Sequence, residues 1–317
     1  MRKFLALSYH YIRPAKEIDP FPRILGNKID DFTDHIKTLG RHYHFVSPKE
    51  VEEFYNTGKP FATKGKIGLL LTFDDGLADH YHVAKLLNNF GIKALFFIPS
   101  CIIEEKLPAN PIIIHYCLAK YGIASFINSL ACSADKLDIR VALPKYKKGG
   151  DVWETIASLK RTIHYGLNAS DSRKLLLSVY RNTFYNDHKN ALEIMHLTVP
   201  RIKEMLYMGH AIGSHSHSHF SAANISGPEL KHELEISKLI LEKNFGVNIN
   251  AFSYTFGLPT DCLSARKLIS LTSAYNLAFT IDEKINTNKT SPLELGRYMP
   301  TSKDTSSSIR QKLISMS

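Results

Sequence analysis

The chain has 317 residues, of which 44% are hydrophobic and 22% charged, so it can bury a core in one large domain or in two ordinary ones. Its formal net charge of +10 favours acidic partners, such as a phosphate-bearing molecule or an anionic membrane surface. Lysine and arginine do not gather in a compact run interleaved with aromatic residues. Nucleic acid is therefore not expected as a partner.

The cysteines and the N-terminus indicate a cellular compartment. The four cysteines form no C-x-x-C pair, which is typical of reduced thiols in a cytosolic protein. Near the N-terminus an apolar run is broken by Tyr9, His10 and Arg13 before it reaches the length of a signal-peptide core. We therefore predict a cytoplasmic protein in which residues 4–9 form a first core strand.

The next elements indicate a parallel α/β arrangement. Residues 67–73 are a continuous apolar run, as in a strand buried on both faces. A helical pattern over 78–90 follows, and residues 93–98 form a second apolar strand that Pro99 ends. A strand, a helix and another strand in this order predict parallel pairing with a right-handed crossover.

Between residues 101 and 195 the strand signals fade and apolar residues recur at helical spacing. Several prolines and the pair Gly149-Gly150 interrupt this pattern. We interpret 101–195 as a mostly helical insertion on the β/α scaffold of one domain, 1–317, which acts as a lid or an interaction surface.

The α/β alternation resumes after the insertion. It predicts helices from an N-cap at Thr198 to about 208 and over 228–244, and strands at 211–213, 250–254 and 278–281. The Ser-rich stretch 305–308 is expected to fray.

Two short segments carry chemistry. The segment 71–76, LTFDDG, places two carboxylates where a buried strand ends at a glycine turn, and such strand ends hold the reactive groups of parallel α/β proteins. One aspartate can bind a metal ion while its neighbour stays free as a base. The alternative is that one aspartate caps the next helix and the other is solvated.

The second segment, 213–219, reads GSHSHSH. In a helical turn His215 and His219 face the same side, because they are four residues apart. In an extended segment His215, His217 and His219 would share a face and form a three-histidine site. Either form predicts a divalent metal ion, which would polarise a carbonyl group and lower the pKa of bound water.

In these motifs the chain resembles the polysaccharide deacetylases of the NodB-homology group, carbohydrate esterase family 4. The first segment matches that family's first motif, and 215–219 matches its second, H-[ST]-x-x-H. The resemblance implies a distorted (β/α) barrel of about seven strands. It also implies that Asp74 is the catalytic base and that Asp75, His215 and His219 bind Zn²⁺ or a similar ion.

Other parts of the chain match the family less closely. Tyr9-His10-Tyr11 resembles the first strand of a subgroup and places His10 near the pocket. The third motif, 252–257 (FSYTFG), lacks the usual arginine, although the backbone N–H of Phe256, with Tyr254 beside it, can donate to an oxyanion. The fifth motif has Arg297 and no histidine, so the general acid is unassigned, with His10 and His217 as candidates. Arg297 would either bind an anionic substrate group or form a structural ion pair.

The expected function is metal-dependent removal of an N-acyl group, acetyl or formyl, from a sugar. A nucleotide- or lipid-linked intermediate of surface-polysaccharide synthesis would suit a basic cytoplasmic enzyme. The incomplete third and fifth motifs motivate an alternative, a metal-containing carbohydrate-binding or assembly protein without turnover. A two-metal phosphoesterase would need more carboxylates near the histidines than this chain has.

Overall fold

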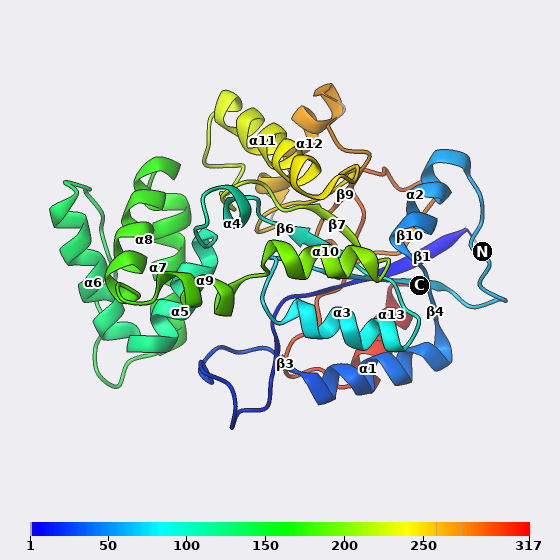
Figure 1. Ribbon diagram of the computed structural model, residues 1–317, viewed down its shortest axis with the longest axis horizontal. Helices are drawn as coiled ribbons and strands as arrows, with labels where there is room; N and C mark the ends of the chain where they lie inside the picture. The colour runs from blue at the N-terminus through cyan, green and yellow to red at the C-terminus, as the bar shows by residue number, and fades with distance from the viewer. Residues whose placement is uncertain (1, 258, 273) are drawn as a thin grey trace.

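The computed structural model describes residues 2–257, 259–272 and 274–317. Its centre is a curled, mostly parallel sheet in the order β10-β1-β5-β6-β7-β8-β9, with β4 beside the first half of β5 (Figure 1). A small second sheet pairs β2 with β3. The strands are β1 (Lys3–Tyr9), β2 (Ile12–Arg13), β3 (Asn27–Lys28), β4 (His44–Phe45), β5 (Gly68–Phe73), β6 (Leu95–Ile98), β7 (Ala211–Ser214), β8 (Ala251–Ser253), β9 (Leu277–Phe279) and β10 (Asn286–Thr287).

The sheet is a half-barrel, and the gap between its edges is spanned by the segment 295–298. An isolated bridge joins Leu295 to Phe279 of β9, and another joins Tyr298 to Leu7 of β1. The expected distorted barrel of about seven strands is therefore confirmed. This connection also carries Arg297 into the interior.

Helices pack around the outer face of the curled sheet. In Figure 1, α1, α3 and α13 lie below the strands, and α11 and α12 lie above them. No helix among the described residues is both long and apolar enough to cross a membrane. The helices outside the insertion are α1 (Ile29–His42), α2 (Pro48–Thr57), α3 (His80–Asn89), α10 (Val199–Tyr207), α11 (Gly227–Phe245), α12 (Pro259–Thr272) and α13 (Ser306–Ser315).

Most helices of the expected helical insertion, 101–195, form a separate group at the left of Figure 1, on the side away from both termini, whereas its first helix, 101–104, lies against α11. The insertion contains the π-helical turn η1, a type of turn that is frequent at functional sites. Its elements are α4 (Cys101–Glu104), α5 (Asn110–Tyr121), α6 (Ile123–Lys136), α7 (Val152–Arg161), η1 (Thr162–Gly166), α8 (Ala169–Thr183) and α9 (His188–Met195).

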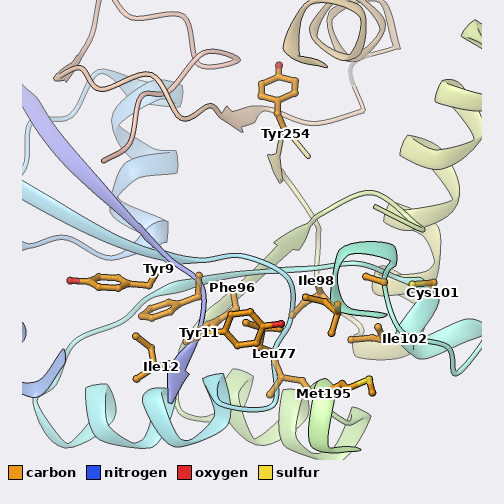
Figure 2. Packing of buried hydrophobic residues seen from close by; sticks show 14 of the residues in the cluster. Tyr9, Tyr11, Ile12, Leu77, Phe96, Ile98, Cys101, Ile102, Met195 and Tyr254 are labelled. Atoms are coloured by element: carbon orange, nitrogen blue, oxygen red, sulfur yellow. The ribbon is translucent and has the colours of Figure 1, made fainter. Parts of the chain in front are cut away.

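The central strands are held by an apolar core that lies under the carboxyl ends of β1, β5 and β6. All six residues of β5 are buried, and its register with β1 ends at the pair Tyr9 and Phe73. The ring of Phe73 stacks on those of Tyr9 and Phe96, with centroid distances of 5.7 and 4.8 Å. Figure 2 shows Tyr9 and Phe96 together with Leu77 and Met195. This packing fixes the point at which the chain leaves β5.

The structure corrects one expectation at the C-terminus. The Ser-rich stretch 305–308 does not fray, because it caps and begins α13. The side chain of Thr305 accepts a hydrogen bond from the backbone N–H of Ser308, and the Ser308 side chain caps Thr305 in return. Composition alone suggested mobility, but serine and threonine are also the preferred N-cap residues.

Gly213 on β7 gives a first prediction about stability. A Cβ atom there would lie 2.6 Å from the Phe97 ring and 2.8 Å from the carbonyl oxygen of Ala251. We expect Gly213→Ala to lower the free energy of unfolding by about 1–3 kcal/mol, the usual cost of overpacking, measured by urea denaturation. Gly227→Ala is the control, because nothing lies within 4 Å of its Cβ position. Equal stability of the two variants would contradict the packing shown by the structure.

Candidate metal centre and its cavity

The two aspartates follow β5 in a turn that directs their side chains into one cavity. Asp75 has φ +75° and Gly76 has φ +56°, both in the left-handed region. A non-glycine residue is strained in that region and keeps the conformation only where its surroundings impose it. Both carboxylates are nearly fully buried, at 3% and 4% exposure, and both line the cavity. Neither of them caps α3, which has no side-chain cap.

The histidine segment after β7 is held by its own backbone contacts. Ser216 and His219 have φ of +58° and +61°. Oε2 of Glu233, on α11, accepts hydrogen bonds from the backbone N–H groups of His217 and Ser218 at 2.9 and 2.8 Å. The resulting turn brings His215 and His219 together, with ring centroids 4.6 Å apart.

His217 points away from this pair. Its Nδ1 lies 2.7 Å from Oγ of Ser100, and its Nε2 lies 3.1 Å from Oε1 of Glu105. It is not among the residues that line the cavity of the aspartates. The extended alternative with three histidines on one face is therefore not what the chain adopts, and the geometry does not favour His217 as the general acid.

Asp75, His215 and His219 form a compact set of potential metal ligands. One ligand atom from each lies within 4.8 Å of the others. The Nε2 atoms of His215 and His219 lie 3.4 and 3.1 Å from Oδ1 of Asp75. Among the described residues, that buried oxygen has no hydrogen-bond partner of good geometry.

The tautomer of His215 supports a cation at this point. Its Nδ1 lies 2.9 Å from the carbonyl oxygen of Ser253, which can only accept, so Nδ1 carries the proton. In the neutral ring Nε2 then presents a lone pair to the Asp75 carboxylate. Two such groups repel each other unless a cation or a proton lies between them. A backbone carbonyl that orients a ligating imidazole is also a common feature of metal sites, so the residues fit the implied ion.

Asp74 is bound by a buried arginine. The guanidinium of Arg297, whose side chain is 0% exposed, donates to both carboxylate oxygens of Asp74, at 2.8 and 2.9 Å. Its other N–H groups donate to Thr72 Oγ1, Ser253 Oγ and the carbonyl oxygen of Thr280. All five N–H groups thus have acceptors, and none remains for a substrate. Of its two expected roles, the structure places Arg297 in the ion pair.

This contact determines the charge of Asp74. Burial alone would raise the pKa of the carboxyl group, but the Arg297 guanidinium, together with the nearby His215 and His10, holds the pKa well below its usual range. Asp74 is therefore ionised at neutral pH. Its Oδ2 accepts from Arg297, Ser253 and Ser8, whereas Oδ1 accepts from Arg297 alone among the described residues. Oδ1 is the oxygen with a lone pair to spare.

The centre opens into a cavity of about 460 Å³, and the other predicted residues lie around it. His10, Tyr254 and Phe256 all line the cavity. Phe256 has φ +61°, and its ring packs edge-on against His219 with centroids 5.0 Å apart. The hydroxyl of Tyr254 donates to the carbonyl oxygen of Leu293 at 2.9 Å, so its one proton is already engaged. In Figure 2 this hydroxyl points away from the buried cluster around Tyr9.

The sequence suggested the insertion as a lid or an interaction surface, but it named none of the residues that the insertion contributes to the cavity wall. His115 of α5, Lys160 and Arg161 of α7, and His164 and Tyr165 of η1 line the same cavity. Lys160 Nζ lies 2.7 Å from His115 Nε2, and Tyr11 Oη lies 3.1 Å from His115 Nδ1. Single histidines and lysines in a helical pattern carry no distinctive signal. Only the fold shows that they face the aspartate and histidine motifs.

A parallel α/β half-barrel with a carboxylate–histidine centre at its strand ends is a frame for hydrolytic chemistry. Residues 179–272, which include the histidine motif, match the family model described as polysaccharide deacetylase. No curated protein matches the chain.

The whole chain also superposes on solved deacetylases. The Streptococcus pyogenes deacetylase PplD in complex with acetate has 19% identity and a TM-score of 0.60, with 99% of each chain covered. IcaB from Ammonifex degensii has 16% identity and a TM-score of 0.59, covering 99% of this chain and 97% of that one. A de-N-acetylase from Aggregatibacter actinomycetemcomitans has 16% identity and a TM-score of 0.58, covering 98% and 100%. The resemblance to the polysaccharide deacetylases, and their fold, are confirmed.

His219, one of the three candidate ligands, gives a prediction about metal binding. We expect His219→Asn to weaken zinc binding by more than about 100-fold, because changes around a site already cost 10–100-fold and here a ligand itself is lost. His217→Asn is the matched control two residues away, because its ring contacts Ser100 and Glu105. Isothermal titration of zinc-free protein measures both. A greater loss in the His217 variant would contradict the assignment of ligands.

Proposed function

We propose that the protein is a metal-dependent hydrolase that removes an N-acyl group, acetyl or formyl, from a sugar. The observation that carries this proposal is the separation of two adjacent carboxylates. Asp75 lies against two imidazoles, whereas Asp74 lies against Arg297. One carboxylate is thus placed to bind a cation and the other to accept a proton.

Asp75, His215 and His219 would hold one divalent ion, and two imidazoles with a carboxylate suit zinc. When bound, the ion would polarise the acyl carbonyl and favour ionisation of water. Asp74 would take the proton of the attacking water at Oδ1, while Arg297 and Ser253 hold the carboxylate in place. The backbone N–H of Phe256 would donate to the developing oxyanion.

His10 would protonate the leaving amine. Burial, and the nearby Lys160, lower the pKa of His115 to about 3. Burial, and the nearby His219, lower the pKa of His164 to about 3 as well. Both rings are therefore neutral at pH 7 and are poor acids. Of the cavity imidazoles outside the three ligands, His10 is left for this step.

The contact between Arg297 and Asp74 favours an enzyme over a non-catalytic binding protein. The alternative was motivated in part by the missing arginine of the third motif, and Arg297 brings an arginine to Asp74 from another part of the chain. In place of the missing fifth-motif histidine, His10 lines the same cavity and would act as the general acid.

The test is release of acetate or formate by zinc-loaded protein from N-acylated sugars. Mass spectrometry of nucleotide-linked, lipid-linked and oligomeric N-acetylglucosamine would show a loss of acetyl mass. Wild-type rates above those of Asp74→Asn support the enzyme. Equal background rates on every sugar would support the binder.

The substrate class and compartment are also part of the proposal. The four cysteines are unpaired, as expected for a reducing compartment such as the cytoplasm. Lys160 and Arg161 add positive charge to the cavity wall, so a sugar that carries a phosphate group would find a cationic partner there. A nucleotide- or lipid-linked acylated sugar meets both conditions.

A further inference from the structure

A second cavity of about 440 Å³ lies beside the metal centre, between the loop after β2 and helices α5, α6 and α7. Large apolar side chains that proteins usually bury are exposed in it: Trp153 is 64% exposed and Leu25 is 61% exposed. Its apolar lining also includes Ile24, Leu118, Ile123 and Ile156. We call this cavity the apolar groove.

The apolar groove adjoins the metal cavity at two residues. His115 and Lys160 line both of them. One N–H of the Lys160 ammonium is directed at His115 Nε2, 2.7 Å away, and an ammonium group has two more to offer. Because the His115 ring is neutral, the positive charge at this junction belongs to Lys160.

The charged side chains that line the apolar groove are of one sign. Arg161 lines the metal cavity and Arg23 lines the apolar groove. Among the described residues that line the groove, none is acidic. From the groove to the metal cavity, the lining therefore changes from apolar surface to a cationic point and then to the metal ligands.

We propose that the apolar groove holds the hydrocarbon chain of a lipid phosphate whose sugar is the substrate, with the phosphate at Lys160 and the acylated sugar at the metal centre. This inference deepens the proposed function and rests on it. Oligosaccharide hydroxyls or a nucleobase would lose their hydrogen bonds with water against this lining, whereas a hydrocarbon has none to lose. The phosphate would gain a charge-assisted contact with the ammonium.

The chain carries a reporter for this test, because Trp153 is its only tryptophan and lies in the groove. We expect farnesyl phosphate, added to zinc-loaded protein, to shift tryptophan emission to shorter wavelength in a saturable manner. Farnesol should bind at least about 10-fold more weakly, because it lacks the charge. Inorganic phosphate alone should cause no shift.

Two variants of matched exposure locate the binding. Leu25→Asp places an acid in the groove and should weaken farnesyl phosphate binding at least about 10-fold, because it adds repulsion and removes apolar surface. Leu239→Asp on α11, at 59% exposure against 61%, should leave binding unchanged. Equal effects of the two variants would overturn the proposal. So would saturation by UDP-N-acetylglucosamine at lower concentration than by farnesyl phosphate.

The fluorescence test does not depend on turnover, so the two proposals can fail separately. A saturable shift without acyl release from any sugar would keep the groove and reject the hydrolase. Acyl release from water-soluble N-acetylglucosamine oligomers, without any shift on addition of farnesyl phosphate, would keep the hydrolase and reject the groove.

Discussion

Asp74→Asn is expected to lose acyl-group release by about 10³-fold or more while the protein still binds zinc. The amide cannot accept the proton of the attacking water, and a positioned general base contributes about 10²–10⁴-fold. The change leaves Asp75, His215 and His219 in place, so metal content should stay at the wild-type level. Acetate release under saturating zinc, together with elemental analysis, measures both properties.

A folding defect must be separated from this catalytic effect. Asp74→Asn leaves the Arg297 charge buried without its partner, which costs stability. The double variant Asp74→Asn/Arg297→Met removes both charges and should recover part of that stability but none of the activity. Activity of the double variant near the wild-type rate would show that Asp74 is not the base.

The sequence predicted the parts of the site that short motifs define. The apolar run of β5, the glycine turn and the histidine spacing each follow from local chemistry, and the structure brings Asp75, His215 and His219 together. The strands and helices around these motifs were also predicted, because their apolar patterns are strong. Their bounds in the structure differ by only a few residues.

The rest depends on contacts between residues far apart in the chain. Arg297 meets Asp74 across 223 positions because the segment 295–298 spans the gap between β9 and β1, and no local pattern encodes that bridge. Likewise, Lys160 and His115 become part of the cavity only through the packing of the insertion. His217 looked equivalent to its neighbours in the motif, but Ser100 and Glu105 hold it elsewhere.

Arg297→Met is expected to lower the free energy of unfolding at pH 7 by about 3–5 kcal/mol, the usual cost of removing one partner of a buried ion pair. The methionine can fill much of the space between Phe97 and Phe279, whose rings flank the guanidinium. The loss therefore comes mainly from leaving the Asp74 carboxylate unpaired. Arg266→Met is the control, because its ion pair with Glu294 is partly exposed and should contribute less than about 1 kcal/mol.

The pH dependence identifies Asp74 as the source of the loss. In the wild type the pKa of Asp74 is depressed, so its stabilising contribution is present above the unfolded value of about 3.9 and is lost only as pH falls below that value. In Arg297→Met, burial is no longer opposed by the guanidinium, so the pKa of this carboxyl rises and its protonation relieves the variant as pH falls toward 4. The difference in free energy of unfolding between the two proteins should therefore narrow from pH 7 to pH 4 in urea titrations.

The double variant Asp74→Asn/Arg297→Met is the control. Its difference from the wild type should stay constant over that range, since the double variant has neither charge. A gap for Arg297→Met that widens or stays fixed would mean that Arg297 stabilises the fold through its packing, and that Asp74 does not depend on it for its charge.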